Sequence, residues 1–201
     1  MMTIRLLLFL IVVLSPATSL GQAYCSLRDP VAVIQASFSD FDYYRSNVRV
    51  VDETDRTAVL ESLGFSIHEN ELGTHTLYTV FSEDDAPLGV IHVRTERGRW
   101  GLNEIAWVLN VDLEVVGMHL QRSRDRYRSY IESEDFQKQI RGKNVNELKA
   151  LLTEDGGTIQ EAELLVPDEA QELAASVIRS ALKTISVTQA VWQDSLPVAN
   201  K

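Results

Sequence analysis

The chain has 201 residues and a formal net charge of −10 at pH 7. This charge argues against binding to nucleic acid or to an anionic membrane surface, because both require a basic protein surface. The length suits one domain with a sizeable hydrophobic core. Cys25 is the only cysteine, so no intrachain disulfide can form and no thiolate cluster can hold a metal.

The first 23 residues have the pattern of a secretory signal peptide. One cation, Arg5, precedes an unbroken apolar run from Leu6 to Leu14, and small residues then provide a cleavage site before Tyr24. The apolar run is shorter than the roughly 20 residues that a membrane span needs. Removing 23 residues from 201 leaves one domain of 178 residues, 24–201, with a net charge of −11. We expect this domain to be periplasmic or secreted, with no direct membrane insertion after cleavage.

The region that follows the signal peptide predicts helices and one short extended piece. Asp29–Pro30 is a helix start, because an aspartate caps free N–H groups and proline fits the first helical position. Apolar residues then recur at helical spacing from Val31 to Phe41. An extended piece covers Val48 to Val51, and a second helix runs from about Asp55 to Leu63, where a glycine follows.

Four segments between residues 74 and 121 predict a meander of antiparallel strands. They are rich in valine, isoleucine, threonine and aromatic residues, and short polar turns separate them. The segments are THTLYTVF (74–81), LGVIHVRT (88–95), NEIAWVLNV (103–111) and LEVVGMHLQ (113–121). Both sides of the third segment are apolar, so we expect that strand to be covered on both faces.

The last third of the chain predicts helices and one strand. Ser133 and Asn144 each cap a short helix, and Ile159 to Val166 predicts a last strand. The longest helix opens at Pro167 and carries an apolar stripe as far as Ile185. The fold class is therefore α+β, a twisted antiparallel sheet (a meander) packed by N-terminal and C-terminal helices.

Four arginines alternate after the last strand of the meander: Arg122, Arg124, Arg126 and Arg128. In a helix they would form two i,i+4 pairs on a solvated face. In the functional interpretation, they form an anion site beside His119 at the end of the strand, because guanidinium groups bind phosphate bidentately. The same stretch would also suit an acidic protein partner.

Two histidines of the first predicted hairpin are expected to lie close together. If this hairpin turns at Asp84–Asp85, His92 lies opposite Leu77 and diagonal to His75. Such a pair could hold a metal together with a carboxylate, but the chain has no His-x-His or H-E-x-x-H pattern. Histidines whose nitrogens are satisfied within the protein, or exposed, are the simpler interpretation.

No motif in the chain identifies a catalytic residue. The sequence has no G-x-S-x-G elbow, and its glycines lack the spacing of a phosphate-binding loop. Trp100 and Trp107 could stack on a planar cofactor or could belong to the core. A hydrolase is therefore the least supported class, and whether the chain is an enzyme stays open.

Three features together resemble a known family. They are the predicted hairpin IAWVLNVDLEVVGMHLQ (105–121), the stretch FQKQIRGK (136–143) and the long closing helix. The region from Asn103 to Ile185 resembles the FMN-binding domain of the exported flavin subunits of the sodium-pumping NADH:quinone reductase and of Rnf electron-transport complexes. The resemblance implies an FMN cofactor and an envelope redox complex, or another envelope protein, as the partner.

The resemblance fails at the position where the family attaches its flavin. The family links FMN to a threonine in an S-G-A-T-like motif just before the last helix. The corresponding segment here, LLVPDEAQELAAS (164–176), contains no threonine. Thr158 follows two glycines, but it lies before the expected last strand.

Two functional hypotheses follow from these observations. In the first, the chain is an exported FMN-binding-like module, with flavin bound non-covalently or lost, that is accessory to envelope electron transfer. His119, Arg122 and Arg124 would then lie on the phosphate side of the flavin. In the second, the chain is a non-redox periplasmic binding or scaffolding protein that uses the Arg122–Arg128 stretch for a protein partner.

Overall fold

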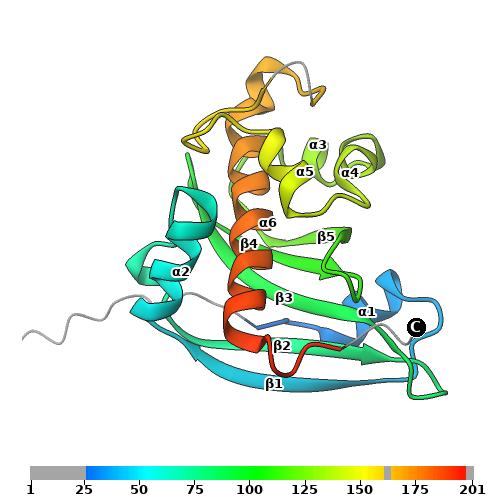
Figure 1. Ribbon diagram of the computed structural model, residues 1–201. Coiled ribbons are helices and arrows are strands. Elements are labelled where there is room, and N and C mark those ends of the chain that lie inside the picture. Colours follow the sequence, from blue (N-terminus) through cyan, green and yellow to red (C-terminus); the bar gives the residue numbers. More distant parts are fainter. Residues whose placement is uncertain (1–25, 161–163, 198–201) are drawn as a thin grey trace, which may run out of the picture.

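The computed structural model describes residues 26–160 and 164–197. The predicted signal peptide, its cleavage site and Cys25 lie outside the described residues. Within these two ranges, no helix is both long enough and apolar enough to cross a membrane. The fold is α+β, as predicted, with one antiparallel sheet between helices (Figure 1).

The sheet has five strands in the order β1-β2-β3-β4-β5, and each strand pairs antiparallel with the next. The predicted four-strand meander is confirmed as β2 to β5, and β1 is a fifth strand at the edge. The strands are β1 (Tyr43–Val51), β2 (Gly73–Phe81), β3 (Pro87–Gly98), β4 (Gly101–Leu109) and β5 (Val115–Arg122).

Strand β1 begins five residues before the predicted extended piece. Its first half, from Tyr43 to Asn47, carries polar side chains that an edge strand leaves in solvent, such as the exposed Arg45 and Ser46. The hydrophobic alternation that predicts a strand is therefore present only in the second half. Pairing with β2 extends over the whole length, from Tyr43 opposite Phe81 to Val51 opposite Gly73.

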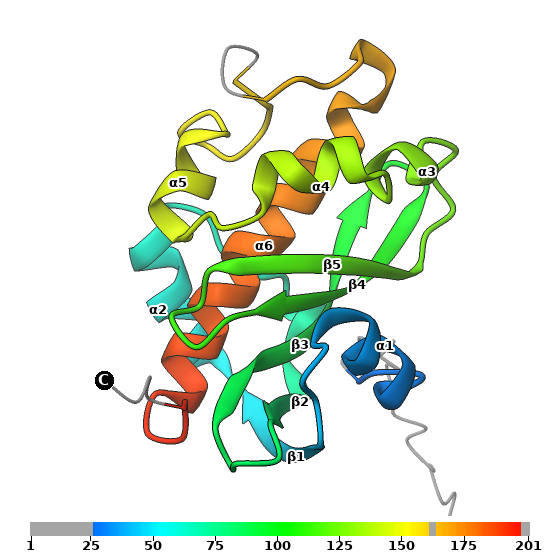
Figure 2. The ribbon, with the colours of Figure 1, turned by 90° about the vertical axis from the view of Figure 1, so that its right-hand side faces the viewer.

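Two hydrophobic cores lie on the two faces of the sheet. Helix α6 (Gln171–Trp192) covers one face, and α1 (Pro30–Ser37) lies on the other (Figure 2). In β4, Ile105 and Trp107 belong to the core under α6, whereas Ala106 belongs to the core under α1. The prediction that this strand is covered on both faces is confirmed.

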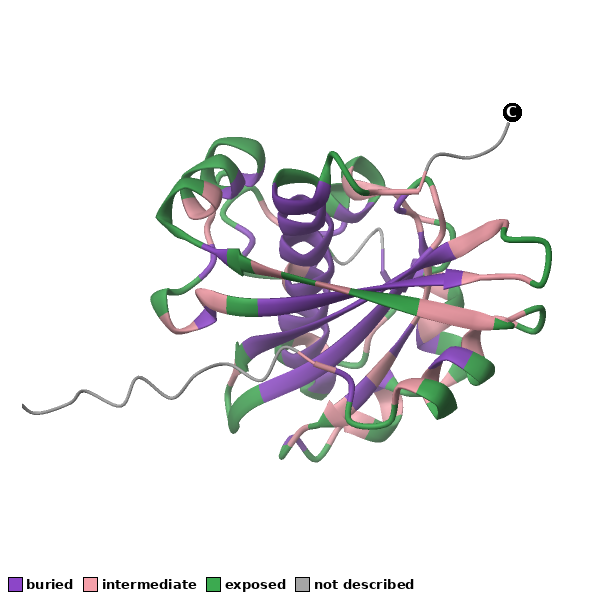
Figure 3. Ribbon diagram, turned by 90° about the horizontal axis from the view of Figure 1, so that it is seen from below, coloured by how far each residue is buried: buried purple, intermediate pink, exposed green. Residues whose placement is uncertain are grey.

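Helix α6 is buried well beyond its apolar stripe, as Figure 3 shows along most of its length. The predicted start at Pro167 is a single 3-10 turn, η2 (Asp168–Ala170), which leads into the α-helix. Helix α2 (Glu53–Leu63) and helix α5 (Val145–Ala150) also pack on α6. As a result, polar side chains such as Lys183 are buried together with the stripe.

The short helices begin at the predicted caps. The side chain of Asp29 accepts a hydrogen bond from the N–H of Ala32, Ser133 caps α4 (Glu134–Ile140), and Asn144 forms a capping box at α5. A four-residue helix, α3 (Arg128–Ile131), and a 3-10 turn, η1 (Glu69–Glu71), complete the described elements.

The predicted strand from Ile159 to Val166 is wrong in the part that the structure describes. Ile159 forms only an isolated bridge with Leu152, and residues 164–166 are irregular. The backbone of Leu165 is satisfied by side chains instead of a strand: its N–H donates to Gln139, and its carbonyl accepts from Gln139 and Tyr130. The run has the composition of a strand, but no strand of the sheet pairs with residues 164–166.

Candidate functional site

The four alternating arginines lie on neither one strand face nor one helix face. Strand β5 ends at Arg122, an irregular loop follows, and α3 begins at Arg128. Arg122 Nη1 lies 3.4 Å from Glu104 Oε1, and Arg128 Nη2 lies 2.7 Å from Glu132 Oε1. Arg124 and Arg126 are exposed in the loop.

The three residues predicted for the flavin phosphate occupy different surroundings. His119 lies opposite Ala106 on the α1 face of the sheet, with its Nε2 3.2 Å from Ser37 Oγ. Burial lowers the pKa of His119, although Glu132 opposes this shift. Arg122 and Arg28 both pair with the carboxylate of Glu104, and Arg124 lies beyond the end of β5. None of these three residues lines the cleft at the start of α6 or the groove between α2 and α6.

A small cleft lies at the start of α6, where three distant segments meet. The β3–β4 turn supplies two residues, the loop after β5 supplies three, and the helix start supplies the rest. The cleft has a volume of about 140 Å³ and is lined by Arg99, Trp100, Asp125, Arg126, Tyr127, Glu169, Glu172 and Leu173. It brings the exposed ring of Trp100 and the partly buried ring of Tyr127 together with cations in a small concave site.

A guanidinium group lies over each of the two aromatic rings of this cleft. The Cζ atom of Arg99 lies 5.5 Å from the centroid of the Trp100 ring, and the Cζ atom of Arg126 lies 5.2 Å from that of Tyr127. Trp100 is 51% exposed. Arg99 also lies 3.8 Å from Glu172 at the helix start, a weak pair because both side chains are well exposed. Within the described part of the chain, the guanidinium group of Arg126 has the Tyr127 ring as its partner and no ion pair.

Hydrogen bonds fix the loop that carries Arg126. The hydroxyl of Ser123 donates to Asn103 Oδ1 over 2.7 Å, and the amide of Asn103 donates to Ser176 Oγ of α6 over 3.3 Å. The buried carboxylate of Asp125 accepts from the N–H of Tyr127 over 2.9 Å. The loop is therefore tied to β4 and to α6 together.

The sequence indicates Trp100 as a stacking residue and Arg126 as part of an anion site, but it does not predict the cleft that both residues line. Trp107, the other candidate for stacking, is fully buried, and its indole N–H donates to Ser180 Oγ over 3.0 Å. The stacking interpretation is therefore wrong for Trp107, which is a core residue. The cleft depends on the packing of three segments, which no local pattern encodes.

A cluster of buried charges lies under the middle of α6. Lys183 Nζ lies 2.8 Å from Glu96 Oε2 and 3.5 Å from Glu71 Oε2, and Arg94 Nη2 lies 3.2 Å from Glu71 Oε1. All four side chains are at most 3% exposed. Burial acts to raise the pKa of Glu71, but the charges of Arg94 and Lys183 outweigh it and lower the pKa. For Glu96, burial prevails over the attraction of Lys183, so its pKa is raised.

The predicted histidine pair lies beside this cluster. His92 stands opposite Leu77, as expected, and its Nε2 lies 3.2 Å from His75 Nδ1. The other nitrogens are also occupied: His75 Nε2 lies 2.8 Å from the carbonyl oxygen of Glu71, and His92 Nδ1 lies 2.9 Å from Thr188 Oγ1. All four ring nitrogens have a protein partner, which confirms that the histidines are satisfied internally.

Burial and nearby charge hold both histidines neutral. Burial, followed by the charge of Arg94, lowers the pKa of His75 to about 3. Burial, His75 and Arg94 hold the pKa of His92 well below its ordinary value. Among the described residues, no group of three histidine, cysteine, aspartate or glutamate side chains is arranged to hold a metal ion.

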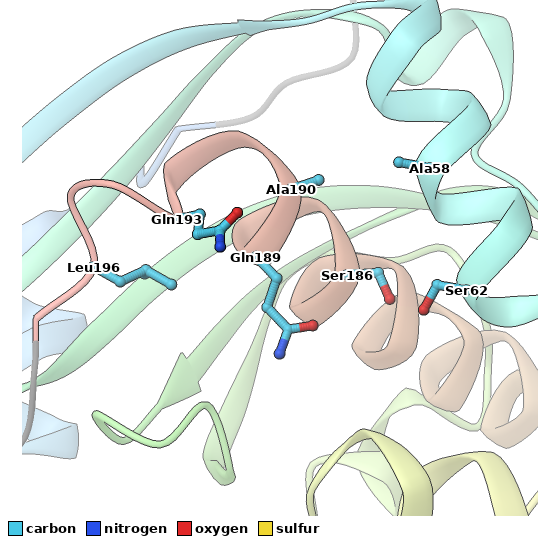
Figure 4. A pocket seen from close by; sticks show the side chains of 7 residues that line it. All are labelled: Ala58, Ser62, Ser186, Gln189, Ala190, Gln193 and Leu196. Atoms are coloured by element: carbon cyan, nitrogen blue, oxygen red, sulfur yellow. The ribbon is translucent and has the colours of Figure 1, made fainter.

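A wider groove separates α2 from the C-terminal part of α6 (Figure 4). It has a volume of about 450 Å³ and is lined by Ala58, Ser62, Ser186, Gln189, Ala190, Gln193 and Leu196. The small side chains allow α2 and α6 to approach closely. Among the described residues that line it, none is charged or aromatic, and the polar groups are the hydroxyls of Ser62 and Ser186 and the amides of Gln189 and Gln193.

Comparisons with known proteins found no match to this chain among family models, curated proteins or solved structures.

Proposed function

We propose that this chain is an exported module that binds FMN non-covalently and is accessory to electron transfer at the cell envelope. The observation that carries the proposal is the cleft at the start of α6. Trp100 and Tyr127 offer aromatic surfaces to a planar ring, and arginine is the side chain best suited to bind a phosphate bidentately.

The position of the cleft supports the proposal as much as its composition. In the family that the sequence resembles, flavin is attached just before the last helix, and the cleft lies at the start of the last helix here. Its volume of about 140 Å³ admits one edge of a tricyclic ring. The rest of the ring would lie against the exposed face of Trp100.

The same region supports a non-covalent mode of binding. From residue 164 to 175 no side chain carries a hydroxyl group, and the first one, Ser176, is buried and bonded to Asn103. Thr158 lies in the loop after α5, which contacts α6 at Arg179 through Gly156 and Gly157, more than two turns from the helix start. Neither hydroxyl is in place for an ester with the flavin phosphate at the cleft.

The proposal assigns the phosphate to Arg126, with Arg99 as the second cation. Glu172 partly neutralises Arg99, whereas Arg126 has no ion pair within the described residues. The earlier expectation for His119, Arg122 and Arg124 stays a sequence-based prediction. The envelope partner, a membrane redox complex or another envelope protein, is inferred from the resemblance alone.

Titration of the purified chain with FMN, followed by flavin fluorescence, tests the proposal. We expect Trp100→Leu and Arg126→Glu each to weaken binding at least about tenfold, equivalent to about 1.4 kcal/mol. Arg45→Glu is the matched control, because Arg45 is also exposed over aromatic rings but lies at the opposite end of the sheet. Equal affinity of all variants, or no saturable binding by the native chain, would contradict the proposal.

The alternative function, a non-redox binding or scaffolding protein, is favoured by one observation. Arg122, Arg124 and Arg126 all expose their side chains along one short segment of an acidic chain. Arg124→Glu tests it most cleanly, because no described ion pair or hydrogen bond of the Arg124 side chain would be lost. Loss of a co-purifying envelope protein in Arg124→Glu, with FMN binding unaffected, would favour this alternative.

A further inference from the structure

A further cavity lies at the end of the sheet where strands β2 and β3 are not paired. Strands β2 and β3 pair only from Leu77 opposite His92 onward, whereas the first residues of β2 continue along β1 and the last residues of β3 continue along β4. The turn η1 (Glu69–Glu71) lies at this opening. The cavity between them has a volume of about 410 Å³, and its lining includes Glu69, Asn70, Glu71, Thr95, Arg97 and Leu102.

The wall of this cavity contains a buried hydroxyl without a partner. Thr95 is 2% exposed, and its Oγ1 makes no hydrogen bond within the described protein. A buried polar group left unpaired costs about 1–3 kcal/mol. A bound molecule that exchanges a hydrogen bond with Thr95 would remove this cost.

Two opposite charges line the same cavity without pairing. Arg97 and Glu69 are both exposed, and neither side chain has an ion pair or a hydrogen bond to another described residue. The amide of Asn70 is likewise without a described partner. In contrast, the carboxylate of Glu71 is already engaged by Arg94 and Lys183. The groups left for a ligand are therefore one cation, one anion, one amide, one hydroxyl and the exposed imidazole of His68.

From this arrangement we infer that the cavity binds a small zwitterion, an α-amino acid with an aliphatic side chain. Arg97 and Thr95 bind its carboxylate, because a guanidinium group and a hydroxyl are both donors suited to an anionic oxygen. Glu69 and Asn70 accept hydrogen bonds from its ammonium group, and Leu102 provides apolar contact for the side chain. The volume of about 410 Å³ is large enough for such a ligand. This site is separate from the cleft at the start of α6.

The probe is L-leucine, titrated into the full mature chain by calorimetry, with amide NMR shifts to locate the site. Two analogues, 4-methylpentanoate and isopentylamine, each keep the aliphatic part but carry only one charge. We expect leucine to bind at least tenfold more tightly than either analogue, with shift changes at residues 69–70 and 95–97. Absence of saturable leucine binding, or equal binding of either analogue, would overturn the inference.

Four substitutions, three at the site and one control, separate binding from folding. Arg97→Gln and Glu69→Gln should each weaken leucine binding at least tenfold, whereas Arg99→Gln, on the same hairpin but in the other cleft, should leave it unchanged. Thr95→Val should weaken binding and yet preserve or raise the melting temperature, because it removes an unpaired buried hydroxyl without leaving a cavity. Unchanged leucine affinity in both Arg97→Gln and Thr95→Val would contradict the site even if all variants fold.

Discussion

Lys183 lies at the centre of a buried ionic cluster that connects α6 to the sheet. It contacts one carboxylate from β3, Glu96, and one from the turn before β2, Glu71. Arg94, two residues before Glu96 on β3, forms an ion pair with the same Glu71. Buried ion pairs add little net stability compared with an apolar core, but they are costly to break, because the remaining charge has no access to water. The cluster therefore fixes how α6 sits on the sheet.

Replacing Lys183 by methionine should be strongly destabilising. The substitution keeps the volume of the side chain but leaves two buried carboxylates with less compensation, so we expect the free energy of unfolding to fall by about 3–5 kcal/mol. Arg128→Met, which breaks a surface pair with Glu132, should cost less than about 1 kcal/mol. Urea denaturation measures both. Similar losses for the two variants would show that the cluster is not the buried network described.

The two buried histidines predict acid sensitivity. Their pKa values are lowered on folding, so the unfolded chain binds more protons than the folded chain once the pH falls below the ordinary histidine value of 6.5. Stability is therefore complete above that pH and decreases as the pH falls toward about 3, the pKa of folded His75. Each histidine contributes a slope of up to about 1.4 kcal/mol per pH unit.

Urea denaturation at several pH values between neutral pH and pH 5 tests this slope. His92→Gln should have a shallower dependence than the native chain, because one of the two titrating groups is absent. His68→Gln is the control, since the side chain of His68 is exposed. A native stability that is flat over this interval would show that the pair is not neutral and buried.

At the scale of the elements, the sequence predicts the parts of the fold whose hydrophobic pattern is complete. Strands β2 to β5 and helix α6 show regular burial on one or both faces, so their composition is sufficient. The prediction for β1 is too short because half of this edge strand is solvated. The predicted strand from Ile159 to Val166 is wrong in its described residues, where the side chains of Gln139 and Tyr130 satisfy the backbone of Leu165. Local patterns do not encode which neighbour completes a hydrogen bond.

The candidate sites were predicted less well than the elements, for the same reason. The approach of His92 to His75 follows from hairpin register, which the turn at Asp84–Asp85 determines, and it was found. The cleft at the start of α6 forms only where the β3–β4 turn, the loop after β5 and the first residues of α6 meet. The ionic cluster requires α6 to cross β3 with Lys183 above Glu96. Both are tertiary contacts between segments far apart in sequence.

The close contact of Gly89 in β3 gives a prediction at this scale. A Cβ atom there would clash with the carbonyl oxygen of Leu109 in β4 and would lie 2.9 Å from Cζ of Phe38. Gly89→Ala should therefore lower the free energy of unfolding by about 3 kcal/mol, as expected for overpacking. Gly117→Ala in β5 meets only the side chain of Gln137, at 3.4 Å, and should cost less than about 1 kcal/mol. Chemical denaturation of the pair distinguishes a steric effect from a general intolerance of alanine in the sheet.

At the scale of the whole molecule, one sheet is covered by a buried helix on one face and by α1 on the other. This arrangement leaves the two hollows that carry the proposals on either side of the β3–β4 turn. Arg99 and Trp100 line the cleft, and Arg97 and Leu102 line the cavity. The chain as a whole has a net charge of −10, so the exposed arginines of the two hollows are local exceptions to its acidic composition.

Export, which the pattern of the first 23 residues predicts, is tested at the scale of the whole chain. We expect the mature protein, expressed from the full-length gene in a Gram-negative host, to be recovered from the periplasmic fraction with Tyr24 at its N-terminus. Arg5→Glu, which removes the cation before the apolar run, should leave more of the chain uncleaved. N-terminal sequencing measures the cleavage, and an intact N-terminus on the native protein would contradict the prediction.

The central claim, that the chain binds flavin without a covalent link, is tested most directly by a visible absorption spectrum. The mature chain is incubated with FMN, passed through a desalting column and then denatured. The account predicts a flavin band that elutes with the folded protein, close to one FMN per chain, and that separates from the protein completely on denaturation. A colourless protein after desalting, or flavin that stays attached to the denatured chain, would contradict it.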